Sequence, residues 1–247
     1  KILAYTFLLL ALIVGTYVFM NSHDDIPVEV LKEKYLYPES KFVEIDGMQV
    51  HYRITGQGFP FVLVHGTAAS LHTWEDWTNI LDKDFQIISF DLPAFGLTGP
   101  RPDRDYSIEN YVSVLNAFVE QIGVDSFHLA GNSLGGSIAW SYAVKHPEKV
   151  AKLVLIDASG YPLDKEPPLV FKIAQNPTLK KVLERLTPKS LVEKSLLDVY
   201  HNDELVTEDL VQRYFEMTIR EGNRQAFGDR VNNLKYENAN VQLGCPS

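Results

Sequence analysis

Four short apolar runs, separated by segments with helical periodicity, constrain the fold of this chain more than any other feature. Each run ends in a polar residue or glycine: "FVLVHG" (61–66), "QIISFD" (86–91), "FHLAGNS" (127–133) and "AKLVLID" (151–157). Such runs are typical of buried strands in a parallel sheet. Between the second and third runs, apolar residues recur at the 3.6-residue spacing of a helix that Ser107 can cap and Gly123 can end. The alternation predicts a doubly wound, mostly parallel α/β sheet.

Two different patterns flank this alternating part. Upstream, "KFVEIDGMQVHYRITG" (41–56) alternates apolar and polar residues around Asp46 and Gly47, which predicts a two-stranded hairpin. Downstream, from Tyr161 to about Tyr236, the strand-like runs stop and the sequence is helical and punctuated by proline. We therefore expect a helical insertion after the sheet-forming segments.

The amino-terminal residues 2–20 form an uncharged apolar run of 19 residues. A helix of this length, at about 1.5 Å per residue, nearly crosses a hydrocarbon layer of roughly 30 Å. A cleaved signal peptide would have a shorter apolar core ending in small residues, whereas this run ends in "YVFM". We therefore predict a single-pass membrane anchor over residues 1–21 and a polar linker over 22–40. Lys1 precedes the run, which puts the amino end in the cytoplasm and the main domain in the periplasm or outside the cell.

The composition argues against several kinds of partner. A net charge of −9 without a stripe of basic residues is unsuited to binding nucleic acid. The single cysteine, Cys245, allows no internal disulfide, and no Cys/His spacing suits zinc. Gly56 and Gly58 do not form a dinucleotide motif, because Phe59 and Pro60 follow where a helix should open. We expect neither a metal nor an organic cofactor.

The third apolar run leads into "GNSLG", which matches the pattern G-x-S-x-G around Ser133. The pattern alone occurs by chance in chains of this length, and a structural serine is the alternative. Its position between a buried strand and a helix favours a nucleophile, because Gly131 and Gly135 permit a turn sharp enough to project the hydroxyl from the sheet. We therefore predict that Ser133 is the catalytic nucleophile.

A serine that attacks a carbonyl also needs donors for the developing oxyanion. The backbone N–H of Leu134, at the start of the following helix, is the first expected donor, and Thr67 in the loop after "FVLVHG" is the second. His65 could be read as a catalytic base. Its place at the end of a buried strand favours instead a side chain that braces the oxyanion loop.

Four segments together resemble the α/β-hydrolase family, in its capped branch with meta-cleavage product hydrolases, epoxide hydrolases and haloalkane dehalogenases: "LVHGTAASLHTW", "FDLPAFGLTGP", "LAGNSLGGSIAW" and "HPEKVAKLVLIDASGYP". The resemblance implies a hydrolase core over 41–160, a helical cap over 161–237 that covers the active site, and the start of a carboxyl-terminal core segment over 238–247. Epoxide hydrolases and dehalogenases carry an aspartate at the position of Ser133. The serine therefore implies an acyl-enzyme formed on an ester, thioester, amide or vinylogous diketone with an apolar portion.

In that family the acid and the histidine base follow the nucleophile in sequence. The final residues "NANVQLGCPS" resemble the approach to a further strand, so the resemblance implies that both groups and the last strands lie beyond residue 247. The chain would then be a fragment, and without its base it would lose activity by on the order of a million-fold. Asp157 is the best internal alternative for the acid. We expect the histidines other than His65 to be surface or packing residues.

Two alternatives to ester hydrolysis remain open at this level. One is hydrolysis of a carbon–carbon bond in a diketone, as in the meta-cleavage relatives. The other is a binding or scaffold protein that keeps the fold without the chemistry.

Overall fold

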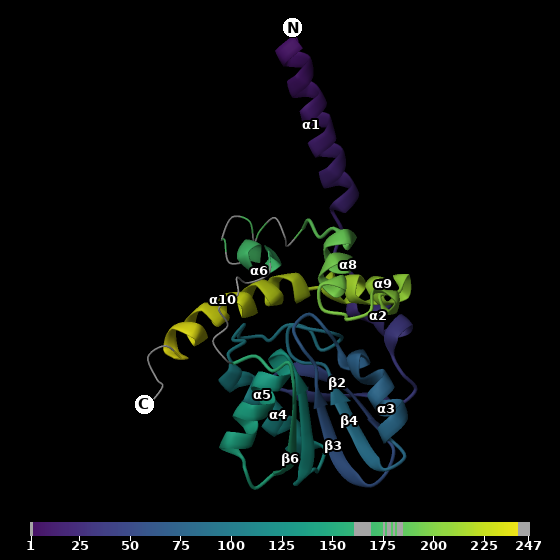
Figure 1. The fold of residues 1–247 in the computed structure, drawn as a ribbon, viewed down its shortest axis with the longest axis vertical. Helices are drawn as coiled ribbons and strands as arrows, with labels where there is room; N and C mark the ends of the chain where they lie inside the picture. Colours follow the sequence, from purple (N-terminus) through teal and green to yellow (C-terminus); the bar gives the residue numbers. More distant parts are fainter. Residues whose placement is uncertain are drawn as a thin grey trace.

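The computed structural model describes the backbone of residues 2–160, 169–174, 176, 179, 181 and 185–241. The predicted cap and the predicted carboxyl-terminal segment therefore lie partly outside the described residues, and Cys245 lies wholly outside them. The chain forms a central sheet with helices on both faces. A further helical layer lies over one end of the strands (Figure 1).

The sheet has six strands in the order β1-β2-β4-β3-β5-β6. The strands are β1 (Ser40–Ile45), β2 (Met48–Thr55), β3 (Phe59–Val64), β4 (Phe85–Phe90), β5 (Phe127–Asn132) and β6 (Val150–Ile156). Strands β1 and β2 form the predicted antiparallel hairpin, and β2 also pairs antiparallel with β4. Strands β4, β3, β5 and β6 are mutually parallel, so the predicted mixed and mostly parallel sheet is confirmed.

Helices cover both faces of the sheet, and the apolar residues of each helix explain its position. Helices α4 (Ile108–Gln121) and α5 (Leu134–Lys145) pack on one face, where residues such as Leu115 and Ile138 join the main core cluster. On the other face, the short helix η1 (Leu71–Trp74) and α3 (Glu75–Leu81) cover a smaller cluster with Trp74 at its centre. Ser107 caps α4 as predicted, by accepting a hydrogen bond from Asn110 N–H.

The helical layer lies above the carboxyl ends of the parallel strands (Figure 1). Its described elements are α6 (Leu169–Ala174), α8 (Lys189–Leu197), η2 (Asp203–Leu205), α9 (Glu208–Thr218) and α10 (Asn223–Val241). Helix α10 runs through residue 237, where the sequence predicts a domain boundary. Because ligands of open α/β sheets bind at the carboxyl ends of the strands, the layer covers the edge where chemistry is expected.

The segment 22–40 is more ordered than the predicted polar linker. It contains helix α2 (Val28–Tyr35) and crosses the helical layer, where Ile26 N–H donates to Ile219 O at 2.8 Å. The Asp25 carboxylate pairs with Arg224, and the Tyr35 hydroxyl donates to Glu216 at 2.5 Å. Polar residues that suggest a linker in the sequence therefore bind the segment 22–40 to the helical layer.

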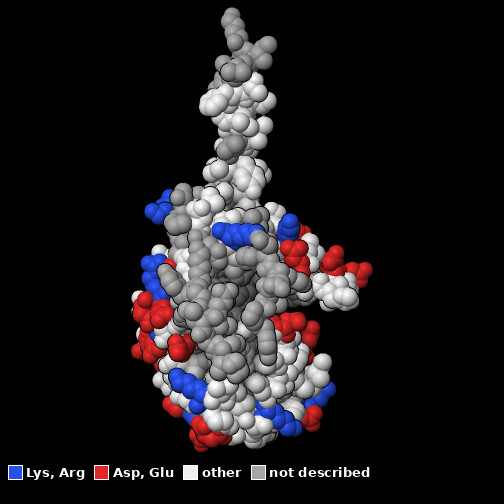
Figure 2. Space-filling model, turned by 60° about the vertical axis from the view of Figure 1, so that its left-hand side comes forward, with Lys and Arg blue, Asp and Glu red and all other residues white. Residues whose placement is uncertain are grey.

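Residues 2–21 form helix α1 (Ile2–Asn21), which projects away from the rest of the chain as an uncharged rod (Figures 1 and 2). Among the residues that the structure describes, no helix combines the length and apolar character needed to cross a membrane. The predicted membrane anchor over 1–21 is therefore not supported.

Candidate active site

Ser133 occupies the turn between β5 and α5, with backbone angles of φ 51° and ψ −114°. A non-glycine residue held at positive φ costs on the order of 1–3 kcal/mol, and such strain is concentrated at functional sites. The side chain is half-buried, and its hydroxyl makes no hydrogen bond with any other described residue. The turn therefore places the hydroxyl at the carboxyl ends of the strands, with no hydrogen-bond partner among the described residues.

The glycines around Ser133 are required by close backbone contacts. A side-chain carbon at Gly131 would lie 2.1 Å from Gly135 O, and one at Gly135 would lie 2.1 Å from Val64 O. A carbon at Gly136 would lie 2.5 Å from Ala158 Cβ. Helix α5 thus begins in contact with β3, β5 and the residues after β6, which only glycine permits.

Backbone hydrogen bonds fix the same turn from the side of β6. Ser133 N–H donates to Ile156 O at 3.0 Å, and Ser133 O accepts from Ser159 N–H at 3.0 Å. The Ser159 hydroxyl donates to the same oxygen at 3.1 Å. The backbone N–H and C=O of Ser133 are therefore both hydrogen-bonded, while its hydroxyl has no described partner.

One predicted oxyanion donor, Leu134, directly follows this turn, and the other, Thr67, is next to a residue that touches it. Leu134 is the first residue of α5, where backbone N–H groups have no partner within the helix. Thr67 is half-buried in the loop between β3 and η1. The neighbouring Gly66 touches the turn, because a side-chain carbon there would lie 3.3 Å from Ser133 Cβ. The fold thus brings the loop of Thr67 against Ser133.

His65 is fully buried and has both ring nitrogens engaged by the backbone. Leu92 N–H donates to Nε2 at 2.9 Å, so the remaining proton is on Nδ1, which donates to Gly66 O at 2.7 Å. Burial lowers the pKa of His65, which favours this neutral form. The geometry supports the predicted bracing role and leaves no ring nitrogen for Ser133.

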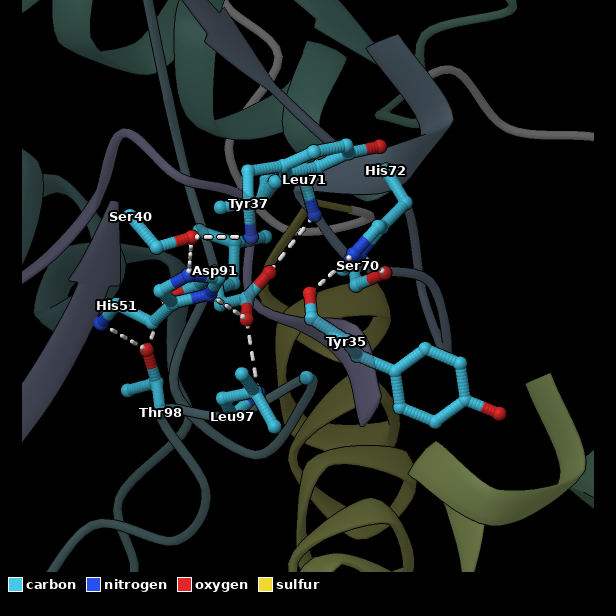
Figure 3. Close-up of polar contacts among 12 residues, drawn as sticks. Tyr35, Tyr37, Ser40, His51, Ser70, Leu71, His72, Asp91, Leu97 and Thr98 are labelled. Atoms are coloured by element: carbon cyan, nitrogen blue, oxygen red, sulfur yellow. Dashed lines mark hydrogen bonds and ion pairs between the residues drawn. The ribbon is translucent and has the colours of Figure 1, made fainter. Parts of the chain in front are cut away.

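Asp91, the residue after β4, is the centre of a buried polar cluster that the sequence analysis missed (Figure 3). Its Oδ1 accepts from Leu71 N–H at 2.7 Å, and its Oδ2 accepts from Leu97 N–H and His51 Nδ1, both at 2.8 Å. Burial raises the pKa of Asp91, but the adjacent His51 outweighs this effect, and the pKa is lowered to about 2. The only sequence signal was its position at the end of an apolar run, as for Ser133.

His51 extends the cluster to a second serine. Its Nε2 lies 2.8 Å from Ser40 Oγ, while Nδ1 donates to Asp91, so the three side chains are connected in the order of a serine–histidine–aspartate relay (Figure 3). However, Ser40 Oγ also accepts from Tyr37 N–H at 3.0 Å. His51 and Asp91 are completely buried, and the relay links the first residue of β1 to β2 and to the residue after β4.

His72, in η1, connects the same loop to α2. Its Nε2 donates to Tyr35 O at 2.9 Å, and its Nδ1 accepts from the Ser70 hydroxyl at 3.0 Å. Burial lowers the pKa of His72 to about 4, so the ring is neutral near pH 7. The prediction that this histidine is a packing residue agrees with its burial.

Arg213 on α9 faces the loop of Thr67 and was not singled out by the sequence. A small cleft between the helical layer and this loop is lined by Ala68, Ala69, Ser70, Arg213, Tyr214 and Met217. The Arg213 Nε is buried and has no hydrogen-bond partner among the described residues. In the sequence this arginine is one of several charged residues on an amphipathic helix, so only the packing distinguishes it.

Asp157 follows β6 and is exposed, and within the described part of the chain it makes no hydrogen bond with a histidine.

A larger cavity of about 400 Å³ lies between Tyr17 of α1 and residues of α6 and α8, but neither Ser133 nor its neighbouring loop lines it. The predicted nucleophile Ser133 therefore lies outside this cavity. No group of three metal-ligating side chains occurs among the residues that the structure describes.

A mixed sheet with a strained serine turn at its carboxyl edge and a helical layer above it defines an α/β hydrolase fold. The chain belongs to the alpha/beta hydrolase fold family, which matches residues 60–232. The turn of Ser133, the loop of Thr67 and Arg213 all lie within the matched part.

Relatives in sequence include two hydrolases from Pseudomonas, and epoxide hydrolases share the fold. The chain is 27% identical over 187 residues to 2-hydroxymuconate semialdehyde hydrolase from Pseudomonas sp. strain CF600, covering 73% of this chain and 62% of that one. It is 25% identical over 191 residues to 2-hydroxy-6-oxo-2,4-heptadienoate hydrolase from Pseudomonas putida, covering 76% and 65%. It thus spans less than two thirds of the length of these relatives. The Cif epoxide hydrolase from Acinetobacter nosocomialis has a similar fold, with a TM-score of 0.70, 24% identity, and coverage of 90% of this chain and 77% of that one.

Proposed function

We propose that the protein is a serine hydrolase that cleaves a carbonyl compound through an acyl-enzyme on Ser133. The single observation that carries the proposal is the strained turn at φ 51°, which holds a hydroxyl without a described partner at the start of α5. The serine oxygen attacks the carbonyl carbon, its proton passes to a base, the leaving group departs, and water then releases the acyl group.

Backbone amides supply the electrostatic part of the reaction in this proposal. The Leu134 N–H is at the amino end of α5, where the helix favours negative charge, and Thr67 contributes the second N–H. Removing one such donor typically costs about 100-fold to 1,000-fold in turnover. Within the described residues no histidine bonds to Ser133 Oγ, so the proposal leaves the base and its acid unassigned.

We further propose that the helical layer is the substrate cap and that residues 41–160 are the hydrolase core. The cleft between Arg213 and the Ala68–Ser70 backbone lies between these two parts. The cleft has no room for a water molecule in this structure, so substrate binding there requires the helical layer and the loop to separate.

Arg213 favours a second candidate within the same chemistry, the hydrolysis of a carbon–carbon bond in a diketone that carries a carboxylate. A buried guanidinium nitrogen without a described partner is costly unless it binds an anion, and arginine binds carboxylates through two parallel hydrogen bonds. The heptadienoate in the name of the Pseudomonas putida relative is such a carboxylate.

Fluorophosphonate labelling of the full-length protein tests the nucleophile. We expect stoichiometric labelling that disappears in Ser133→Ala and persists in Ser40→Ala, because only Ser133 has the turn geometry of a nucleophile. Equal labelling of the wild type and Ser133→Ala would refute the assignment, and an unlabelled wild type would favour a binding protein without catalytic activity.

Arg213→Gln separates the two substrate classes. If the site binds a carboxylate, turnover of a carboxylate-bearing diketone should fall at least tenfold more than turnover of a neutral ester. Equal losses on both substrates would contradict the carboxylate site while leaving the serine hydrolase assignment intact.

A further inference from the structure

We propose that Asp91 is the positioning residue of the oxyanion site, because it fixes the loop of residues 65–71 and thereby sets the place of the Thr67 amide beside Ser133. The inference rests on the proposed function of Ser133. The inference gives Asp91 a role in the reaction, although its carboxylate makes no hydrogen bond with the turn of Ser133 in the described structure.

Both ends of this loop are held by two consecutive residues, Asp91 and Leu92. At the first end, the His65 ring accepts from Leu92 N–H at 2.9 Å and donates to Gly66 O at 2.7 Å. At the second end, the Leu71 N–H donates to Asp91 Oδ1 at 2.7 Å. Thr67 lies between these two attachments, so breaking either of them releases one end of the loop that carries it.

The chemistry of the second attachment requires a carboxylate. All three partners of the Asp91 carboxylate are N–H donors, and an ionised carboxylate is an acceptor only. An amide at this position would turn an NH2 group toward Leu71 N–H, or toward His51 and Leu97, and lose those bonds. The turn 92–98 closes tightly around the group, because a side-chain carbon at Gly96 would lie 2.3 Å from Asp91 Cγ. There is little space in which an altered side chain could relax.

The loop transmits this constraint directly to the serine. The space at Gly66 is so tight that an added side-chain carbon would lie 3.3 Å from Ser133 Cβ, and Thr67 is the next residue. A displacement of about 1 Å in a catalytic group costs on the order of 100-fold in rate. Loss of the bond between Leu71 and Asp91 should therefore weaken the Thr67 donor without removing the nucleophile.

Acylation by an ester and by its thionoester analogue tests this role in the full-length protein. An oxyanion site built for oxygen stabilises the larger sulfur anion poorly, so the ratio of the two acylation rates reports donor geometry. We expect Asp91→Asn to lower acylation by the ester about 100-fold and to lower the oxygen-to-sulfur ratio about tenfold. The ratio is independent of the folded fraction, because both rates scale with it.

Leu71→Pro provides a second variant in case Asp91→Asn does not fold. It deletes the N–H that binds Oδ1 and also replaces the buried Leu71 side chain, so its effect is read from the ratio, which does not depend on the folded fraction. It stands at the first position of η1, where proline is tolerated after the extended Ser70. It should lower the ratio as Asp91→Asn does. Asp103→Asn is the control, because Asp103 is a surface carboxylate paired with Arg101 and should leave the ratio unchanged.

The outcomes separate this inference from the proposed function. Slower acylation with an unchanged ratio in both variants would make Asp91 a stabilising residue only and overturn the inference. An unchanged rate would overturn it as well. Acylation that does not depend on Ser133 in the wild type, measured first with Ser133→Ala, would overturn both proposals.

Discussion

Ser133 and Ser40 lie in the same domain and have opposite surroundings. Ser133 has a strained backbone, a helix amino terminus beside it and a hydroxyl with no described partner. Ser40 has ordinary strand geometry and is connected to His51 and Asp91 at 2.8 Å for each link, and its oxygen also accepts Tyr37 N–H. One site has the proposed nucleophile and its proposed oxyanion donors, and the other has a relay of histidine and aspartate.

Under the proposed function, the serine–histidine–aspartate chain of hydrogen bonds at Ser40 is structural and the reaction takes place at Ser133. At Ser40 every polar group is satisfied within a buried cluster, which stabilises the fold and leaves no open position for a substrate. At Ser133 the fold instead maintains strain and a hydroxyl with no partner among the described residues, which costs stability and, in the proposed function, provides the nucleophile.

Gly135→Ala should have the largest effect on stability. The added carbon would lie 2.1 Å from Val64 O, so α5 must move away from β3, and we expect a loss of about 4 kcal/mol or more. Gly123→Ala is the matched control, because its site is open and only its φ of 74° is unfavourable, for a loss of about 1 kcal/mol. Urea denaturation of both variants measures the difference, and equal losses would show that the close contact at the turn is dispensable.

His51→Leu should destabilise the protein by about 3–5 kcal/mol, because it leaves the buried Asp91 charge without its partner. Ser40→Ala should cost only about 1 kcal/mol, the usual contribution of one hydrogen bond. Chemical denaturation at pH 7 gives both values. A loss below 1 kcal/mol for His51→Leu would mean that the relay does not stabilise the fold as the contrast requires.

As the pH is lowered, protonation of the buried histidines should reduce the free energy of unfolding at a higher pH than protonation of Asp91 does. The pKa of His72 is lowered to about 4 in the folded chain, while an unfolded histidine titrates near 6.5, so the unfolded chain binds the proton first. The stabilisation is complete above pH 6.5 and is lost as the pH falls toward 4, by about 3 kcal/mol. His72→Gln should flatten this part of the profile, measured by urea midpoints from pH 7 to pH 4.5, and superimposable profiles would contradict the prediction.

Asp91 should contribute to acid unfolding at lower pH than His72. Its pKa is lowered to about 2 when folded, against about 3.9 when unfolded, so its stabilisation persists down to about pH 4 and is lost toward pH 2. In Asp91→Asn the stability should therefore vary less between pH 4 and pH 2 than in the wild type. Circular dichroism across this range checks the difference, and parallel curves for the two proteins would exclude it.

Ser133→Gly should have the smallest effect, and with the opposite sign. Glycine adopts φ 51° without strain, so we expect a gain of about 1 kcal/mol in unfolding free energy together with the loss of labelling. Ser137→Gly, within α5, should instead lose about 0.5 kcal/mol, because glycine weakens a helix interior. A loss of stability in Ser133→Gly would mean that the turn is not strained.

The sheet, its flanking helices and the position of Ser133 were predictable, because each follows from a local pattern. Apolar runs mark strands, the 3.6-residue spacing and Ser107 mark α4, and the glycines around Ser133 mark a tight turn. Residues 22–40 were harder to predict, because their polar side chains bond to residues about 200 positions away, as Asp25 does with Arg224. Such partners leave no periodic signal in either segment.

The α/β class and the serine at a strand-to-helix turn could be predicted from the sequence, because both depend on neighbouring residues and on the conformational freedom of glycine. The polar residues that meet at the carboxyl ends of the strands could not, because they come together through tertiary packing. Asp91 became the attachment of the Thr67 loop, and Arg213 became a guanidinium facing that loop, because burial and packing brought distant segments together. Hydrogen bonding and charge depend on distances of a few ångströms in space, which spacing along the chain does not set.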